Sequence, residues 1–201
     1  MKKIIALLCL IVVLSFSSTS VFAQDGMKWG LKLGVNGNTF IGDDAKSTRM
    51  TGGFNAGVFS EWRLNDNFII QPELIFTKKG GKATLPDEFG EVNLLLNYLE
   101  LPILFKYNLP MDWVEANVFA GPYFSHLFSV NDKQDIEDRN TLKKFNRFDW
   151  GVVVGVGAGF NTFLGKVGLD ARYDMGLQNL DEKANDDFRN GVGSINLSYA
   201  L

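Results

Sequence analysis

The stretch Asn97–Pro110, NYLELPILFKYNLP, is apolar enough for a core strand, yet it carries two charges, Glu100 and Lys106. Successive side chains of an extended strand point to opposite faces. Read with this period of two, every second residue from Leu99 to Tyr107 forms one apolar face, and both charges lie on the other face. The fold must therefore place a wholly apolar face and a partly ionic face of the same strand.

The same alternation recurs along the chain between segments rich in turn-forming or charged residues. Eight such segments can be marked, at residues 28–38, 54–64, 68–78, 94–108, 113–128, 148–161, 166–178 and 190–201. Nothing between them has the 3.6-residue period of an amphipathic helix. The sequence predicts an all-β protein with eight strands.

The connections between these segments alternate in length. Three are short, at 65–67, 109–112 and 162–165, and four are long, at 39–53, 79–93, 129–147 and 179–189. Strict alternation puts every long loop at one end of the sheet and both termini at the other. Outer-membrane barrels show this asymmetry, with short periplasmic turns and long extracellular loops. We expect an eight-stranded antiparallel up-and-down transmembrane β-barrel whose N and C termini are periplasmic.

Two orientations of the faces are possible, because a soluble ligand-binding barrel uses the same period with its apolar face inside. Glycines crowd the polar face, as in Gly151–Gly159, which suits the tight interior of a small barrel. Large aromatic residues gather at the short-turn ends of the strands, as in the belts at membrane interfaces. The predicted interface aromatics are Trp29, Trp62, Phe68, Tyr107, Trp113 and Tyr199. Both features favour lipid outside and polar residues inside.

In this orientation the ionic face lines a narrow lumen. The predicted polar network of the lumen comprises Glu61, Arg63, Glu73, Glu100, Lys106, Asp170, Arg172 and Asp174. Acids and bases there should pair, because an unpaired charge out of water costs several kcal/mol. We interpret the network as a polar core that closes the channel. The alternative, an open ion path, needs more room than eight strands provide.

The N-terminus reads as a cleaved secretory signal peptide over residues 1–23. Lys2 and Lys3 precede an apolar run, which ends in Ser17–Ser20 and the small-x-small pattern Val21-Phe22-Ala23. Residues 24–201 then form one outer-membrane barrel domain, exported to the cell outer membrane. The only cysteine, Cys9, falls within the signal, and the net charge of −3 gives no reason to expect a nucleic-acid partner.

The last eight residues, SINLSYAL, keep the alternation up to the end of the chain. They resemble the C-terminal insertion signal of outer-membrane barrels, which has an aromatic residue third from the end. Tyr199 occupies that position, and Leu201 stands where the signal usually has Phe. The expected partners are outer-membrane lipid and, through Tyr199 and Leu201, the barrel-assembly machinery. We name no other protein partner, and expect a monomer.

The residues of this sequence show little evidence of a catalytic site. His126 is the only histidine, and its neighbour Ser125 points to the opposite face of a strand, so the two cannot form a nucleophile–base pair. A triad of Ser125 or Ser129 with His126 and Asp149 stays an alternative. No cysteine or histidine cluster suggests zinc, and the acidic segment 131–138 lacks the spacing of a calcium loop. We expect no enzyme and no cofactor.

Several motifs together resemble one known family. They are GLKLGVN (30–36), GFNAGVF (53–59), QPELIFTKKG (71–80), NYLELPILFKY (97–107), AGPYFS (120–125) and GLDARYDMGLQNL (168–180). This series is similar to the outer membrane protein β-barrel domain family, often called PorT-like. Pro72, Pro102 and Pro122, which should each remove a ladder hydrogen bond and leave the nearby strand register open, belong to these motifs.

The resemblance implies fold and location more than activity. A founding member is implied in protein secretion across the outer membrane, so a secretion-related role is an expectation that rests on likeness alone. We expect a structural or interaction role through the extracellular loops in a Gram-negative cell. The alternatives are an outer-membrane barrel enzyme acting on lipid or peptide at the rim, and a soluble lipocalin-like periplasmic binder.

Overall fold

The computed structural model describes residues 27–42, 48–84, 91–111, 114–132, 146–163, 165–179 and 189–200. Within these ranges the regular structure consists of strands alone. They are β1 (Met27–Ile41), β2 (Thr48–Arg49), β3 (Thr51–Arg63), β4 (Phe68–Thr84), β5 (Glu91–Asn108), β6 (Glu115–Asp132), β7 (Phe148–Thr162), β8 (Gly165–Gly176) and β9 (Arg189–Ala200). The prediction of an all-β chain is confirmed.

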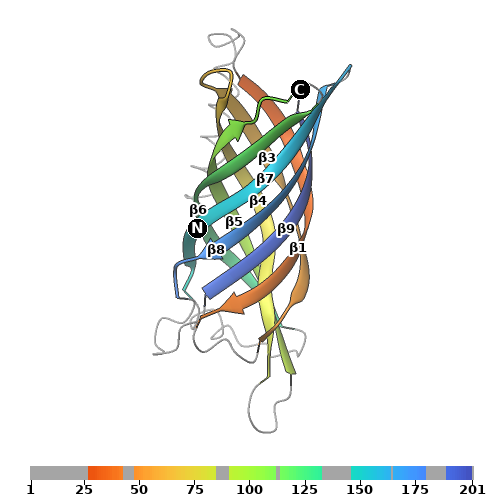
Figure 1. Cartoon of the computed structure of the whole chain (residues 1–201). Coiled ribbons are helices and arrows are strands. Elements are labelled where there is room, and N and C mark those ends of the chain that lie inside the picture. Colours follow the sequence, from red (N-terminus) through yellow and green to blue (C-terminus); the bar gives the residue numbers. More distant parts are fainter. Residues whose placement is uncertain are drawn as a thin grey trace.

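The strands close into one antiparallel barrel (Figure 1). Their order in the sheet is β2-β4-β3-β1-β9-β8-β7-β6-β5, and a further pairing of β4 with β5 closes the cylinder. The two-residue β2 pairs with β4 beyond the end of β3. It therefore lengthens the barrel wall and does not add a ninth strand around the barrel. Closure of the eight long strands is as expected, and it leaves no free sheet edge around the barrel.

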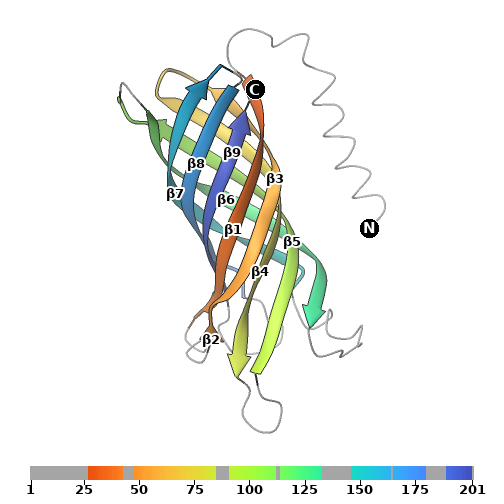
Figure 2. The ribbon, with the colours of Figure 1, turned by 90° about the vertical axis from the view of Figure 1, so that its right-hand side faces the viewer.

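The two ends of the barrel differ (Figure 2). The short connections, which follow β3, β5 and β7, lie at the end where β1 begins and β9 finishes; we call it the short-turn end. At the opposite, long-loop end, β4 and β5 project beyond the neighbouring strands. The predicted loops at 79–93 and 129–147 therefore start too early, because strand pairing continues to Thr84 and Asp132.

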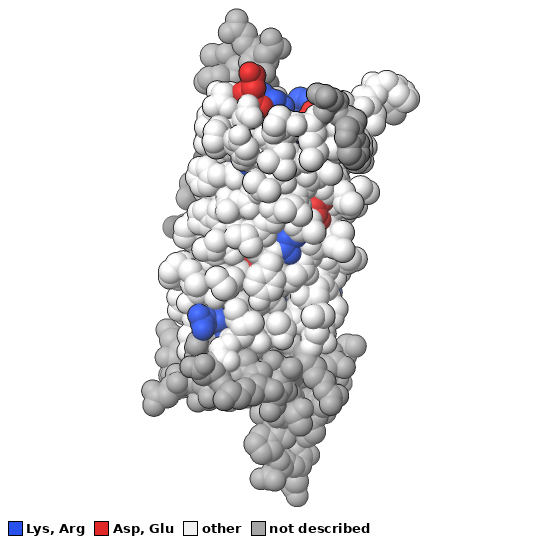
Figure 3. All heavy atoms as spheres, viewed as in Figure 1, with Lys and Arg blue, Asp and Glu red and all other residues white. Residues whose placement is uncertain are grey.

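The apolar register faces outward. Leu33, Val154 and Leu169 are 63%, 49% and 53% exposed. Glu100, Arg172 and Asp174, from the opposite register, are buried inside the barrel. Figure 3 shows a wall on which uncharged side chains cover almost the whole face. The predicted orientation is confirmed, and the soluble binder with an inward apolar face is wrong.

The interior is not purely polar, which corrects the expectation that charges replace a hydrophobic core. Leu104, Phe119, Tyr123 and Val153 form a buried cluster inside the barrel. A second cluster of Leu96, Tyr98 and Leu127 lies nearer the long-loop end. Apolar side chains thus occupy the part of the lumen lined by β5, β6 and β7, where they pack beside the ion pairs.

Glycines on the inward register make room for these aromatic rings. A Cβ atom placed on Gly155 would lie 2.4 Å from the Phe119 ring, and one on Gly151 would lie 2.7 Å from the Tyr123 ring. Both distances are far below van der Waals contact. The alternating glycines of β7 are therefore explained by packing in a narrow lumen.

The prolines leave the strand register intact. Pro72 pairs with Ile103, Pro102 with Tyr123 and Pro122 with Val152, and all peptide bonds of the described chain are trans. The register shift of this region lies instead between Asn97 and Tyr98, at a bulge in the pairing of β5 with β6. A missing N–H interrupts the ladder locally without displacing the strands.

We expect Gly155→Ala to destabilise the barrel by about 1–3 kcal/mol, because the added methyl group overlaps the Phe119 ring. Gly193→Ala is the matched control: its Cβ would meet nothing within 4 Å, so stability should change by less than about 0.5 kcal/mol. Equilibrium unfolding in phospholipid vesicles measures both. Equal effects of the two variants would contradict the packing explanation.

We expect Val154→Arg to cost about 2–4 kcal/mol of folding stability in a bilayer, because it places a charge on the lipid-facing wall midway along β7. Leu64→Arg, in the exposed turn after β3, should cost less than about 1 kcal/mol. Guanidinium unfolding of vesicle-embedded protein tests the pair. Similar costs at both positions would contradict a lipid-facing wall.

Candidate functional site

The most distinctive site is a set of ion pairs inside the barrel, which we call the lumen network. In the described part of the chain it joins five cations to seven carboxylates. The cations are Lys32, Lys79, Lys106, Lys166 and Arg172; the carboxylates are Glu61, Glu73, Glu100, Glu115, Asp149, Asp170 and Asp174. Every long strand except β9 contributes a residue to these ion pairs, so the network connects strands on opposite sides of the barrel.

The central group connects β1, β4 and β8. Lys32 Nζ lies 2.5 Å from Glu73 Oε1 and 3.1 Å from Asp170 Oδ2. Arg172 Nη1 donates to the second oxygen of Glu73 at 2.8 Å. Glu73 is thus held between two cations at almost complete burial, in the arrangement that compensates best for lost hydration.

The long-loop group continues from Arg172. Its guanidinium lies 3.4 Å from Asp174 and 3.8 Å from Glu100. Glu100 also lies 2.5 Å from the ammonium of Lys79, which in turn is 3.3 Å from Asp149. Lys79 and Glu100 are completely buried, so bulk solvent touches neither side chain at this level.

The short-turn group is more exposed. Glu61 bridges Lys106 at 3.1 Å and Lys166 at 3.5 Å, and Lys166 reaches Glu115 at 2.7 Å. The side chain of Glu115 is 29% exposed at the start of β6, and that of Lys106 is 12% exposed. The network therefore passes from a partly hydrated end to a dry interior.

Neutral donors offset the excess of carboxylates. Ser125 donates to Glu100 at 2.9 Å, and Asn190 donates to Asp149 at 2.9 Å. Asn196 donates to Asp170 at 2.7 Å. A buried carboxylate needs such donors where cations are too few, because unsatisfied lone pairs in a low dielectric are costly.

Seven of the eight predicted lumen residues lie in the network, and one does not. The structure brings together Glu61, Glu73, Glu100, Lys106, Asp170, Arg172 and Asp174 within the network. Arg63 differs: it is the last residue of β3 and is exposed to solvent, although it shares the inward register of Glu61. The strand simply reaches the mouth of the barrel at this residue.

Five charged members of the network are not among the eight predicted lumen residues: Lys32, Lys79, Glu115, Asp149 and Lys166. Apart from Lys79, all of them lie on the inward registers of their predicted strands, so the alternation alone could have found them. Lys79 is the first residue of the predicted loop at 79–93. Only the pairing of β4 with β5 past this point shows that Lys79 turns inward.

The predicted triad of Ser125, His126 and Asp149 is not assembled in the structure. Lys79 Nζ lies 3.4 Å from Ser125 and 3.3 Å from Asp149, so the structure brings these two residues near each other. His126, however, belongs to the outward register, where its ring packs 4.9 Å from the Phe148 ring. The barrel wall separates the histidine from Ser125, so no triad forms.

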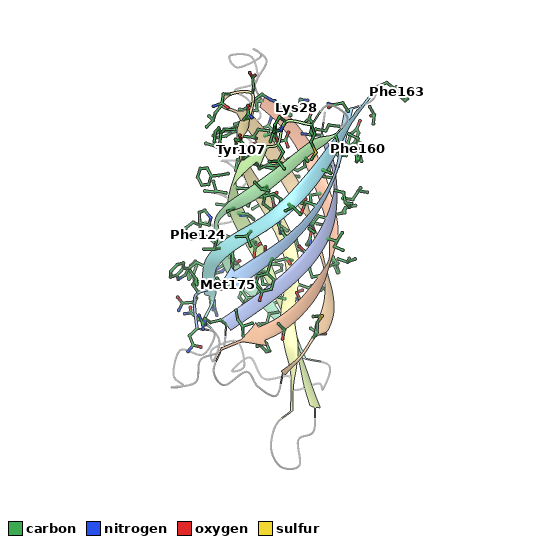
Figure 4. The ribbon with its side chains drawn as sticks, viewed as in Figure 1. Lys28, Tyr107, Phe124, Phe160, Phe163 and Met175 are labelled. Carbon is green, nitrogen blue, oxygen red and sulfur yellow. The ribbon has the colours of Figure 1, made fainter. Side chains whose placement is uncertain are left out.

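Two belts of aromatic side chains ring the outer wall. Trp29, Trp62, Phe68, Tyr107 and Tyr199 lie at the short-turn end, as predicted, and four of them, all but Trp29, are at least 36% exposed; Trp113 lies outside the described residues. A second belt, missed by the sequence analysis, includes Phe54, Phe124, Phe128, Phe148 and Trp150. Figure 4 shows Tyr107 and Phe160 toward one end, with Phe124 and Met175 farther along the wall. Girdles at both interfaces are typical of transmembrane barrels.

Some of the other predicted features lie outside the described residues. Leu201 and residues 133–138 of the acidic segment lie outside them. Among the residues inside them, no three histidine, cysteine, aspartate or glutamate side chains are placed to hold a metal ion. The described chain also contains no helix long and apolar enough to cross a membrane.

Comparison with known families now adds to the geometry. The model of the family described as outer membrane protein beta-barrel domain matches residues 22–182. The chain belongs to this family. The protein is therefore an outer-membrane β-barrel with a charged interior, and its short-turn end corresponds to the periplasmic side of such barrels.

The solved structures that are similar to this chain share little sequence identity with it. Ail, the attachment invasion locus protein of Yersinia pestis, is 14% identical over 89% of this chain and 100% of its own, with a TM-score of 0.47. Neisserial surface protein A is 12% identical over 88% and 100%, with a TM-score of 0.49. Outer membrane protein W of E. coli is 12% identical over 89% and 100%, with a TM-score of 0.47.

None of the curated proteins compared with this chain matches it in sequence. The strand pairings carry the fold assignment, and the family match carries the location.

We expect Glu73→Gln to lower the free energy of unfolding by about 3–5 kcal/mol, because it deprives the buried Lys32 and Arg172 of their shared counter-ion. Glu115→Gln makes the same chemical change at the hydrated rim and should cost less than about 1 kcal/mol. Guanidinium titration of both variants in the same micelles compares them. A Glu73→Gln midpoint close to that of Glu115→Gln would contradict a structural role for the central group.

Proposed function

We propose that this protein is a closed, non-enzymatic barrel of the Gram-negative outer membrane that acts through the connections at its long-loop end. The observation that supports closure is the complete burial of Lys79 and Glu100, which also form ion pairs across the lumen with Asp149 on β7 and Arg172 on β8. In a conducting pore, water would contact the charged side chains along the whole length of the lumen. Lys79 and Glu100 instead contact each other in place of water.

Packing supports the same conclusion. Tyr98 and Tyr123 are fully buried beside Lys79, and the Lys79 ammonium lies 4.1 Å from the centroid of the Tyr123 ring. Eight strands leave an interior just wide enough to be filled by side chains. With rings and ion pairs side by side, the lumen offers no continuous aqueous path at this level.

A non-enzymatic role is favoured because the catalytic alternative loses its histidine to the lipid-facing side. Solutes also lack a route to Ser125, which is buried and donates to Glu100. A sealed barrel can still bind a partner through its long loops, because binding residues often lie on loops that a rigid scaffold holds in place. The protein partner is unknown.

The remaining expectations belong to this proposal. Export through a cleaved signal peptide at residues 1–23, insertion through Tyr199 and Leu201 by the assembly machinery, and a monomeric state are predictions from the sequence. The PorT-like resemblance, with the secretion-related role that it implies, rests on the motifs quoted above. It would gain support if deletion of this protein left exported proteins in the periplasm.

Planar-bilayer recording tests closure. Purified protein inserted into a bilayer in 1 M salt should give no single-channel steps at either polarity, whereas a known porin under the same conditions supplies the positive control. Regular conductance steps that scale with salt concentration would overturn the proposal, because ions would then cross the level of Lys79 and Glu100.

A further inference from the structure

Hydration of the lumen is one-sided. From the short-turn end inward, side-chain exposure falls from 29% at Glu115 and 12% at Lys106 to 2% at Lys32 and zero at Lys79. At the long-loop end, the inward side chains of the described residues are buried, both apolar ones such as Leu96 and Val192 and amides such as Asn38 and Asn190. The two ends of the described barrel therefore differ in solvent exposure.

A pocket lies at the hydrated end. Its wall includes Glu61, Lys106, Asn117, Lys166 and Ser198, with glycines of β7 and β8 that keep it from being filled. Its volume of about 20 Å³ exceeds the minimum for a water molecule. The pocket therefore has room for a ligand of about the size of water.

The wall offers both donors, on Lys106 and Lys166, and acceptors, so its chemistry suits water, which donates and accepts. Asn117 is 5% exposed, and its side-chain oxygen has no partner among the described residues. The carboxylate of Glu61 and the hydroxyl of Ser198 supply further acceptors beside it. Water is stable in a cavity that offers two to four polar partners, and this wall provides them.

We propose that the lumen is a blind vestibule, which binds water at the periplasmic end as far as Asp170 and is sealed beyond it, at Glu73 and Arg172. This proposal rests on the proposed closed barrel and locates its seal. The vestibule keeps the short-turn ion pairs and Asp170 in exchange with the periplasm, while Glu73, Arg172 and the long-loop group stay out of contact with bulk solvent.

Cysteine accessibility tests the proposal, because Cys9 is the only cysteine and Cys9→Ala gives a thiol-free background. Three inward positions on β9 form a series: Ser198 in the pocket wall, Ser194 at 6% exposure and Val192 at 2%. Ser198→Cys, Ser194→Cys and Val192→Cys are all close in size to the native residue. Each is treated, folded in micelles, with hydrogen peroxide, a neutral thiol oxidant little larger than water, and the thiols that remain are counted after denaturation, with an untreated sample as the control for an intact thiol.

We expect Ser198→Cys to react rapidly and the other two to react on the order of a hundredfold more slowly, at a rate set by opening of the structure. Slow reaction at all three positions would overturn the vestibule and, together with absent conductance, would leave the closed barrel standing. Fast reaction at all three would overturn both proposals, and bilayer recording would then show conductance. Fast reaction at Val192→Cys alone would place the open mouth at the wrong end.

Discussion

The structure depends on pairing charges inside a cylinder whose outer surface faces hydrocarbon. Closing eight strands satisfies the backbone hydrogen bonds, which is the condition for a strand to cross a bilayer. It also forces every second side chain into a narrow lumen. Once Glu73 is there, removed from water, it needs counter-ions, and Lys32 and Arg172 supply them from two other strands.

This constraint connects strands that are distant in the sequence. Arg172 on β8 contacts Glu73 on β4 and Glu100 on β5, so one guanidinium braces opposite sides of the barrel. Its planar, multidentate donor group suits this better than an ammonium would. Lys79 extends the bracing to β7 through Asp149. Such cross-axis contacts make the lumen a core, although it is built largely from charge.

Glycine makes this core possible. Rings such as Phe119 and Tyr123 enter the lumen only because the facing positions on β7 lack a Cβ. The same scarcity of space favours closure over conduction, since rings and ion pairs fill the section where Lys79 lies. Toward the short-turn end the glycines outnumber the rings, and there the pocket beside Ser198 remains.

The number of long strands, the alternation of their connections and the apolar face of each strand can be predicted from the sequence alone, because they follow from local periodicity. The same periodicity places Glu100, Arg172 and Asp174 inside. Tertiary structure alone decided the inward turn of Lys79, the solvent exposure of Arg63 and the partners within the network. Those depend on where each strand ends and how neighbouring strands are staggered, and a period of two residues carries no information about either.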